Sequence, residues 1–146
     1  MPLFPNLIIK GLRPKRYTVP YPTELKHIGD HIRKTRLERG LTSEKVAEIL
    51  GVSIGTISQW EVQKRMPQIY TFPAIIKFLG YDPLYIDDTS LLSKIENYRR
   101  VHGLTYKKLA KLCSIGHETI QKIVAGNMDK HPKVVHKILN VIEPSD

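Results

Sequence analysis

Residues 40–61 read GLTSEKVAEILGVSIGTISQWE, and this stretch decides the fold. Thr42 or Ser43 can cap a helix, because a side-chain oxygen there accepts a hydrogen bond from a free amide of the first turn. Apolar residues then recur at helical spacing, at Val46, Ala47, Ile49 and Leu50. Gly51 ends this helix, since glycine accepts the positive φ at which other side chains clash.

A second helix begins shortly after Gly51. Ser53 can cap it, and Ile57 and Trp60 fall on one face, which predicts that both side chains point inward. Trp60 could instead be a stacking platform for bases, but a tryptophan in an apolar stripe is typical of a core anchor. The stretch therefore predicts two short helices joined by a tight turn, a helix-turn-helix.

Two further helices complete a compact unit over about residues 24–82. The first runs from Thr23 or Glu24 to about Glu38, with apolar positions at Leu25, Ile28, Ile32 and Leu37. The last ends at Gly80, has Pro73 in its first turn, and carries the apolar series Ile69, Phe72, Ile75, Ile76 and Leu79.

This unit recurs 63 positions later. An ungapped shift superposes GLT at 40–42 on GLT at 103–105, and it also pairs Ile32 with Ile95 and Arg36 with Arg99. Repetition across the caps and both apolar stripes predicts a second copy over residues 91–146. Residues 83–90 then form a linker that ends in a cap at Thr89 or Ser90.

The second copy departs from the first at the turn. Its turn glycine is displaced, because Cys113-Ser114-Ile115-Gly116 stands in place of Leu50-Gly51-Val52-Ser53. Ile123 stands in place of Trp60. The apolar pattern is kept, so we expect this copy to fold, and the predicted fold class is all-α with two tandem helix-turn-helix domains.

Composition limits the classes of function. The formal net charge of +9 favours a polyanionic partner, because neutralised phosphates release condensed counterions. The chain has one cysteine, so it forms no intramolecular disulfide and no thiolate metal site of its own. It also lacks a long apolar run and a secretory signal pattern, and we expect a soluble cytoplasmic protein associated with the nucleoid.

An irregular arm precedes the first unit, over residues 1–23, and holds five of the ten prolines. Its cationic residues cluster around Gly11 and Pro14, and they are Lys10, Arg13, Lys15 and Arg16. Two interpretations are open: the arm lies on phosphates or in a minor groove, or it is a solvated tail.

The first unit resembles the lambda-repressor-like helix-turn-helix family, of the Cro and xenobiotic-response-element type. The matching residues are Ile32-Arg33, Arg36, Gly40-Leu41-Thr42, Val46-Ala47, Leu50-Gly51-Val52-Ser53, Thr56-Ile57-Ser58-Gln59-Trp60-Glu61 and Pro67. The resemblance also covers residues 91–143, less closely, and it leaves the arm uncovered.

The resemblance implies that the helix from Ser53 to about Val62 enters the major groove of double-stranded DNA. It places Ile54, Gly55, Ser58 and Gln59 toward the bases and Thr56 near the backbone. The family often has polar readers where this chain has Ile54 and Gly55, which weakens base readout by this helix alone.

The resemblance implies a phosphate contact at Ser43. Lys64 and Arg65, directly after the recognition helix, are candidates for a second backbone contact, or they form a solvated basic surface. The resemblance further implies an ion pair between Arg36 and Glu61. In the second copy Val124 stands at the place of Glu61, so that pair is lost.

In the second copy the corresponding helix presents His117, Glu118, Gln121 and Lys122. These side chains can read bases, but Glu118 repels phosphate. The second copy can therefore bind DNA or act as a docking or dimer module, and both interpretations are open.

Catalytic and metal sites are not expected. His27 and His31 have the i, i+4 spacing of a metal pair, but no glutamate follows His27 and no third ligand is evident. No nucleophile turn or glycine-rich phosphate loop occurs, so we expect no enzyme activity and no cofactor.

We expect a sequence-specific regulator of transcription of bacterial or phage type, bound to double-stranded DNA as a monomer or homodimer. The alternative is a protein-interaction adaptor or antitoxin-like accessory factor that uses the helical domains to bind a partner.

Overall fold

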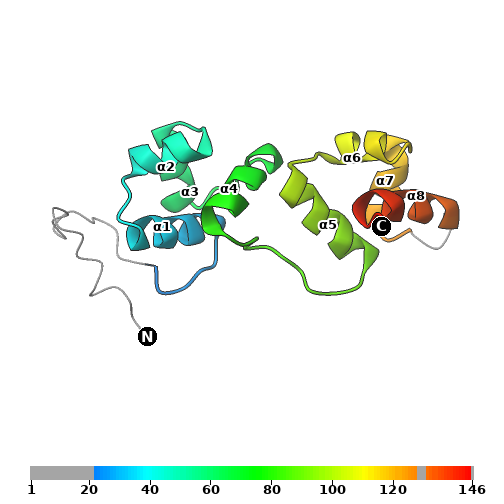
Figure 1. Cartoon of the computed structure of the whole chain (residues 1–146), viewed down its shortest axis with the longest axis horizontal. Helices are drawn as coiled ribbons and strands as arrows, with labels where there is room; N and C mark the ends of the chain where they lie inside the picture. Colours follow the sequence, from blue (N-terminus) through cyan, green and yellow to red (C-terminus); the bar gives the residue numbers. More distant parts are fainter. Residues whose placement is uncertain (1–21, 128–130, 146) are drawn as a thin grey trace. The chain divides into compact units, whose positions relative to one another are not determined.

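The computed structural model describes residues 22–127 and 131–145, and this part of the chain is helical with no strand (Figure 1). The chain divides into two compact units. Within the described residues, unit 1 comprises 22–68 and 74–83, and unit 2 comprises 69–73, 84–127 and 131–145. No helix in these residues is both long and apolar enough to cross a membrane.

Unit 1 is built on α1 (Ile28–Glu38), α2 (Ser43–Leu50), α3 (Ile54–Glu61) and most of α4 (Phe72–Leu79). Helix α1 begins at Ile28, so the prediction of a start at residue 23 or 24 was wrong. The reason is a local cap: the Asp30 carboxylate accepts hydrogen bonds from the backbone N–H groups of Lys26 and His27, at 3.1 and 2.9 Å. These amides are held outside the helix.

The turn between α2 and α3 follows the prediction. Thr42 caps α2 by accepting from the Lys45 amide, and Ser53 caps α3 by accepting from the Thr56 amide. Gly51 has φ 68° and closes α2 in the left-handed conformation, while the Val52 amide donates to the Ala47 carbonyl at 3.0 Å. This hydrogen bond reverses the chain direction between the two helices.

The core of unit 1 is lined by Ile32 of α1, Val46 of α2, Ile57 of α3 and Ile75 of α4, none of which is exposed. Trp60 is also buried, so the prediction that it anchors the core is confirmed. Ile49 was wrongly placed on the inward stripe, because it is 47% exposed. In a helix of only eight residues, Val46, Ala47 and Leu50 already fill the buried face.

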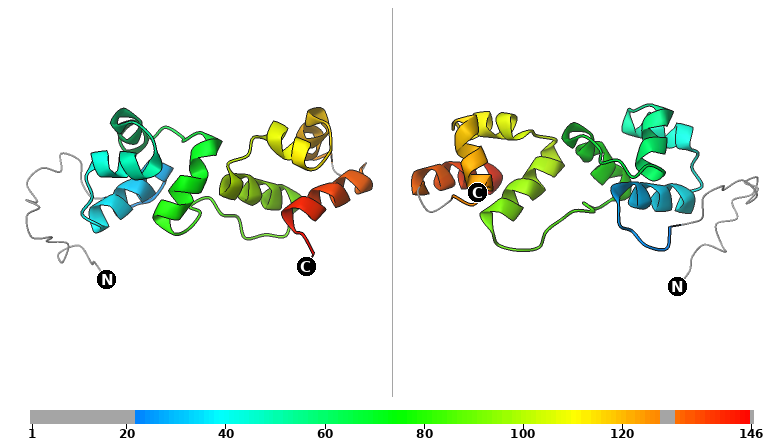
Figure 2. Two further views of the ribbon diagram at one scale, coloured as in Figure 1. Left: turned by 45° about the horizontal axis from the view of Figure 1, so that its top comes forward. Right: turned by 180° about the vertical axis from the view of Figure 1, so that it is seen from behind.

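Unit 2 contains α5 (Leu91–His102), α6 (Tyr106–Leu112), α7 (His117–Val124) and α8 (Pro132–Ile142). Ser90 caps α5 by accepting from the Ser93 amide, as the linker pattern predicts. Buried apolar side chains from all four helices form one core, which includes Ile95, Leu109, Ile120 and Ile138. Figure 2 shows α6 and α7 side by side in two further views.

The α6–α7 turn repeats hydrogen bonds of the α2–α3 turn 63 positions later. The Ile115 amide donates to the Ala110 carbonyl at 3.0 Å, as Val52 donates to Ala47. Ser114 takes the left-handed conformation of Gly51, with φ 55°, and Gly116 takes the N-cap position of Ser53 without a side-chain hydrogen bond. The two residue types have exchanged places while the backbone path is kept.

The first helix of unit 2 has a different set of neighbours from α1. Helix α5 packs on α8 and on the 3₁₀ turn η3 (Ile69–Thr71), whereas α1 packs on α3. Gly103 ends α5 at φ 66°, and a Cβ built there would lie 3.0 Å from Pro73 Cγ. The segment 69–73 therefore belongs to the packing of unit 2.

Candidate nucleic-acid interface

Helix α3 presents one buried and one exposed face. Ile57, Trp60 and Glu61 are buried. The side exposed to solvent consists of the positions implied by the family resemblance, Ile54, Gly55, Ser58 and Gln59. Thr56 is half-buried, and its hydroxyl lies 2.9 Å from the Ser53 hydroxyl. The exposed face of α3 thus offers one amide side chain, one hydroxyl and the methyl groups of Ile54, which is 50% exposed.

An ion pair fixes the C-terminal end of α3 to α1. Arg36 Nε and Nη2 donate to the two carboxylate oxygens of Glu61, both at 2.8 Å, and both side chains are buried. Arg36 Nη1 also donates to the Leu41 carbonyl at 3.3 Å. The Arg36–Glu61 pair is therefore confirmed, and its bidentate geometry restricts the orientation of α3 relative to α1.

Gly29 allows α1 to approach α3 at the same end. A Cβ built on Gly29 would lie 1.7 Å from the Trp60 carbonyl oxygen, a distance that no side chain can occupy. This close approach adds a second constraint on the direction of α3. Sequence reasoning missed it, because a glycine inside a helix carries no sign of which backbone it faces.

Asp30 and Lys64 form another contact that sequence reasoning missed. The Lys64 ammonium pairs with the buried Asp30 carboxylate, and Lys64 itself has φ 56°. Burial alone would raise the pKa of Asp30, but hydrogen bonds from Lys64 and from the His27 amide outweigh it and lower the pKa below the ordinary aspartate value. Lys64 thus connects the segment after α3 to the start of α1, and its ammonium group is already paired with the Asp30 carboxylate.

The other candidate phosphate contacts of unit 1 lie at the ends of helices. Ser43 is the first residue of α2, directly after the Thr42 cap, and it is half-buried. Arg65 is exposed, and its amide donates to the Gln59 carbonyl at 3.2 Å. Arg65 therefore lies shortly after α3 in the chain, and its side chain is exposed to solvent.

Helix α7 of unit 2 also separates into two faces. Ile120 and Ile123 are buried. The exposed residues are those singled out in the sequence, His117, Glu118, Gln121 and Lys122. This face carries more charge than the exposed face of α3, which holds no ionisable group.

A different cluster takes the place of the Arg36–Glu61 pair in unit 2. Arg99 donates to the Glu96 carboxylate and, at 3.0 Å, to the Leu104 carbonyl, and its guanidinium lies 3.5 Å from the centre of the Tyr106 ring. The Tyr106 hydroxyl donates to Glu96. Burial and the neighbouring Glu96 carboxylate raise the pKa of Tyr106 to about 12.

The remaining candidates divide into those outside the described residues and those with other partners. The cationic arm residues Lys10, Arg13, Lys15 and Arg16 lie outside them. His31 Nδ1 lies 2.7 Å from the Tyr81 hydroxyl. The described residues hold no group of three or more histidine, cysteine or acidic side chains that could bind a metal ion.

Two capped helices joined by a glycine turn, with one face buried and the other open, define a helix-turn-helix. Residues 32–86 match the family model described as helix-turn-helix. The match covers α1 from Ile32 onward, α2, α3 and α4, and it indicates a DNA-binding helix-turn-helix regulator. Neither the curated proteins nor the solved structures that were compared give a match.

Proposed function

We propose that the chain is a sequence-specific regulator of transcription, of bacterial or phage type and of the Cro and xenobiotic-response-element kind, that inserts α3 into the major groove of double-stranded DNA. The observation that supports this proposal is the presentation of α3. Its inner face is fixed by Trp60 and by the Arg36–Glu61 pair, while Ser58 and Gln59 stay open to solvent. A rigid helix with open polar groups can hold a fixed position against base edges.

Each exposed side chain of α3 has a role in this proposal. Gln59 pairs with adenine through its amide, Ser58 donates to or accepts from a base edge, and Ile54 touches a thymine methyl group. Arg65 and Ser43 contact the phosphate backbone. The protein works without enzymatic activity or a cofactor, in the cytoplasm on the nucleoid, as a monomer or homodimer.

Unit 2 is proposed to be a second, tandem helix-turn-helix. The support is the backbone of the α6–α7 turn, which repeats the hydrogen bonds of the α2–α3 turn 63 positions later. Its α7 then offers His117, Glu118, Gln121 and Lys122 to a partner.

A protein-interaction adaptor is the second candidate function. It is favoured by the apolar side chains on and after α3, since Ile54, Val62 and Met66 are 50%, 56% and 66% exposed. Apolar exposure of this kind suits a protein partner as well as a groove.

Selection of bound sequences from random duplex DNA separates the two candidates. A regulator yields a common motif and loses affinity steeply with salt, whereas an adaptor binds no duplex even at low salt. Within the regulator proposal, Gln59→Ala should relax preference at one position of the motif, with a loss of about 1–3 kcal/mol against the preferred base. Gln63→Ala, an exposed glutamine outside α3, is the matched control and should leave the motif unchanged.

Arg65→Ala tests the placement of α3 differently. Loss of a phosphate contact should weaken binding to every sequence alike and leave the motif intact. Identical behaviour of Gln59→Ala and Arg65→Ala would contradict the proposed orientation of α3.

A further inference from the structure

The charged residues on the exposed faces of α2 and α6 sum to net charges of opposite sign. Each position of α6 lies 63 residues after its counterpart in α2. On α2 the charged residues are Glu44, Lys45 and Glu48, and at the matched positions on α6 they are Lys107, Lys108 and Lys111. The reversal extends to the whole motif, since residues 43–61 hold one lysine and three glutamates, while 106–124 hold four lysines and one glutamate.

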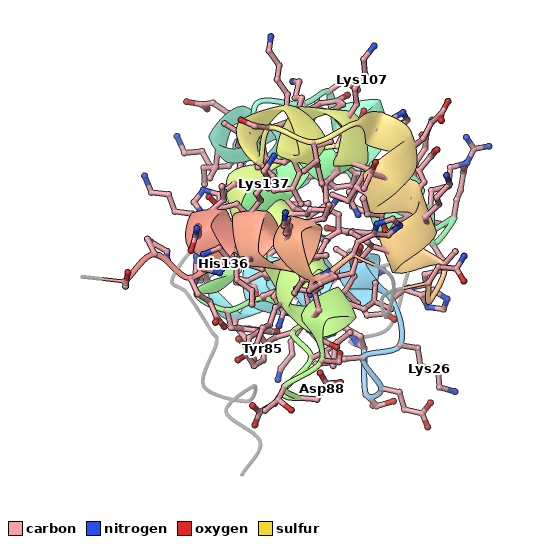
Figure 3. All side chains as sticks on the ribbon, turned by 90° about the vertical axis from the view of Figure 1, so that its right-hand side faces the viewer. Lys26, Tyr85, Asp88, Lys107, His136 and Lys137 are labelled. Carbon is pink, nitrogen blue, oxygen red and sulfur yellow. The ribbon has the colours of Figure 1, made fainter. Side chains whose placement is uncertain are left out.

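The three lysines of α6 lie on one side of the helix. At about 100° per residue they fall within an arc of about 100°. Leu109 and Ala110 are buried on the opposite side. All three lysines are exposed, and in Figure 3 the Lys107 side chain projects outward from α6. We call Lys107, Lys108 and Lys111 the lysine face.

The charge of the lysine face is not balanced within unit 2. On α2, Lys45 pairs with Glu48 at 3.3 Å. Across the described residues, no ion pair involves a lysine of the lysine face. Like charges three and four residues apart destabilise a helix by a few tenths of a kcal/mol per pair. Helix stability therefore gives no reason for this arrangement, whereas a polyanionic ligand does.

We propose that the lysine face of unit 2 binds the phosphodiester backbone of duplex DNA and contributes about three phosphate contacts to the salt-dependent affinity of the chain. Unit 1 reads bases through a recognition helix whose exposed face has no ionisable group. This inference rests on the proposed function in one respect: both units bind the same DNA duplex. The unit with the weaker sequence pattern thus adds electrostatic attraction to the base readout of unit 1.

The phosphate backbone fits the lysine face better than a protein surface does. Lysine ammonium groups act as point charges that need no fixed orientation, and evenly spaced phosphates satisfy several at once. Each phosphate that is neutralised contributes about 0.9 to the slope of log affinity against log salt concentration.

The test compares the salt dependence of duplex binding by the full chain and its variants. The triple variant Lys107→Gln, Lys108→Gln and Lys111→Gln should reduce the slope by about 2 to 3. Lys45→Gln is the matched control, because Lys45 occupies in α2 the place of Lys108 and is paired with Glu48. It should change the slope by less than about 0.5. Circular dichroism melting checks that each variant is folded, and the single lysine variants should each lower the slope by about 1.

The outcomes separate this inference from the proposed function. A triple variant that binds duplex with the wild-type slope overturns the inference and leaves base readout by α3 intact; this is also the result expected if the face binds an acidic protein. A chain that shows the slope loss but selects no common motif supports the inference and contradicts sequence-specific regulation. Absence of duplex binding at low salt overturns both.

Discussion

Units 1 and 2 share a turn but differ in what holds the helices on either side of it. In unit 1 the close approach at Gly29 and the Arg36–Glu61 pair fix α3 against α1. At the matched positions unit 2 has Leu92, which is exposed, and Val124, which is half-buried, and α5 packs on α8 and η3 instead. The comparison shows that the turn depends on its own backbone hydrogen bonds, while the supports around it can be replaced.

Gly29→Ala is expected to have the largest effect on this comparison. The added methyl group would overlap the Trp60 carbonyl, which cannot move without displacing α3, so unit 1 should lose about 4 kcal/mol or more of unfolding free energy. Trp60 is the only tryptophan and is buried in unit 1, so its fluorescence during denaturant unfolding reports on that unit.

Gly55→Ala is the control for this substitution. Gly55 lies on the exposed face of α3, and the nearest atom to an added Cβ is Ser53 Oγ at 3.8 Å. Alanine there should stabilise α3 by about 0.5–1 kcal/mol, because glycine is the weaker helix former. A similar loss from both substitutions would show that α1 does not constrain α3 through Gly29.

Glu61→Gln should break the second support of unit 1. It leaves the buried Arg36 guanidinium without a countercharge, which typically costs about 3–5 kcal/mol. The corresponding change in unit 2, Glu96→Gln, affects a carboxylate that is 24% exposed, and we expect a loss of about 1 kcal/mol. Equal losses, measured by denaturant unfolding followed by circular dichroism, would mean that the two units are held in the same way.

Asp30→Asn tests the contact that has no counterpart in unit 2. Because the pKa of Asp30 is lowered in the folded state, its ionised form stabilises unit 1 above the unfolded pKa, and that contribution is lost as pH falls through the folded value. At pH 7 we expect a loss of about 1–3 kcal/mol. The difference between wild type and variant should begin to shrink below about pH 4, the ordinary aspartate range, and should vanish only below the lowered folded pKa.

Glu48→Gln serves as the comparison for Asp30→Asn. It removes the charge of an exposed carboxylate paired with Lys45, and the expected effect is below about 1 kcal/mol at every pH. Trp60 fluorescence during unfolding at several pH values measures both variants. A pH-independent loss for Asp30→Asn would contradict an ionic role for this carboxylate.

Restoring the turn of unit 1 in unit 2 should stabilise the protein, by less than the losses expected for Gly29→Ala and Glu61→Gln. Ser114→Gly removes a side chain from a left-handed residue, and Gly116→Ser adds a cap to α7; together they should stabilise unit 2 by about 1–2 kcal/mol. The Cys113 thiol is buried, so its reaction with a thiol reagent requires unit 2 to open, and this reaction should slow in the double variant. An unchanged rate would show that the turn does not limit opening.

Sequence predicted the features that depend on near neighbours. Caps at Thr42 and Ser53, the turn at Gly51 and the burial of Trp60 all follow from spacing within one or two turns of helix. Ile49 was misplaced because periodicity marks a stripe but not how wide the buried part of a short helix is.

The contacts that position the candidate site were harder to predict. The Asp30–Lys64 pair joins residues whose proximity depends on the packing of unit 1, and Tyr106 reaches the i, i+3 pair of Glu96 and Arg99 from the next helix. One signal was present in the sequence, since Asp30 stands three residues after His27, the spacing at which a carboxylate reaches back to the amide before a helix.

The short segment Ile69–Pro73 determines how this protein can be divided. It belongs with unit 2, although ten residues of unit 1, Ala74–Pro83, follow it in the chain. A fragment cut at the linker, starting at residue 84, would lack the backbone and proline ring that cover Gly103 at the end of α5. Proteolysis in the linker should therefore release a C-terminal piece that is less stable than the same helices in the intact chain.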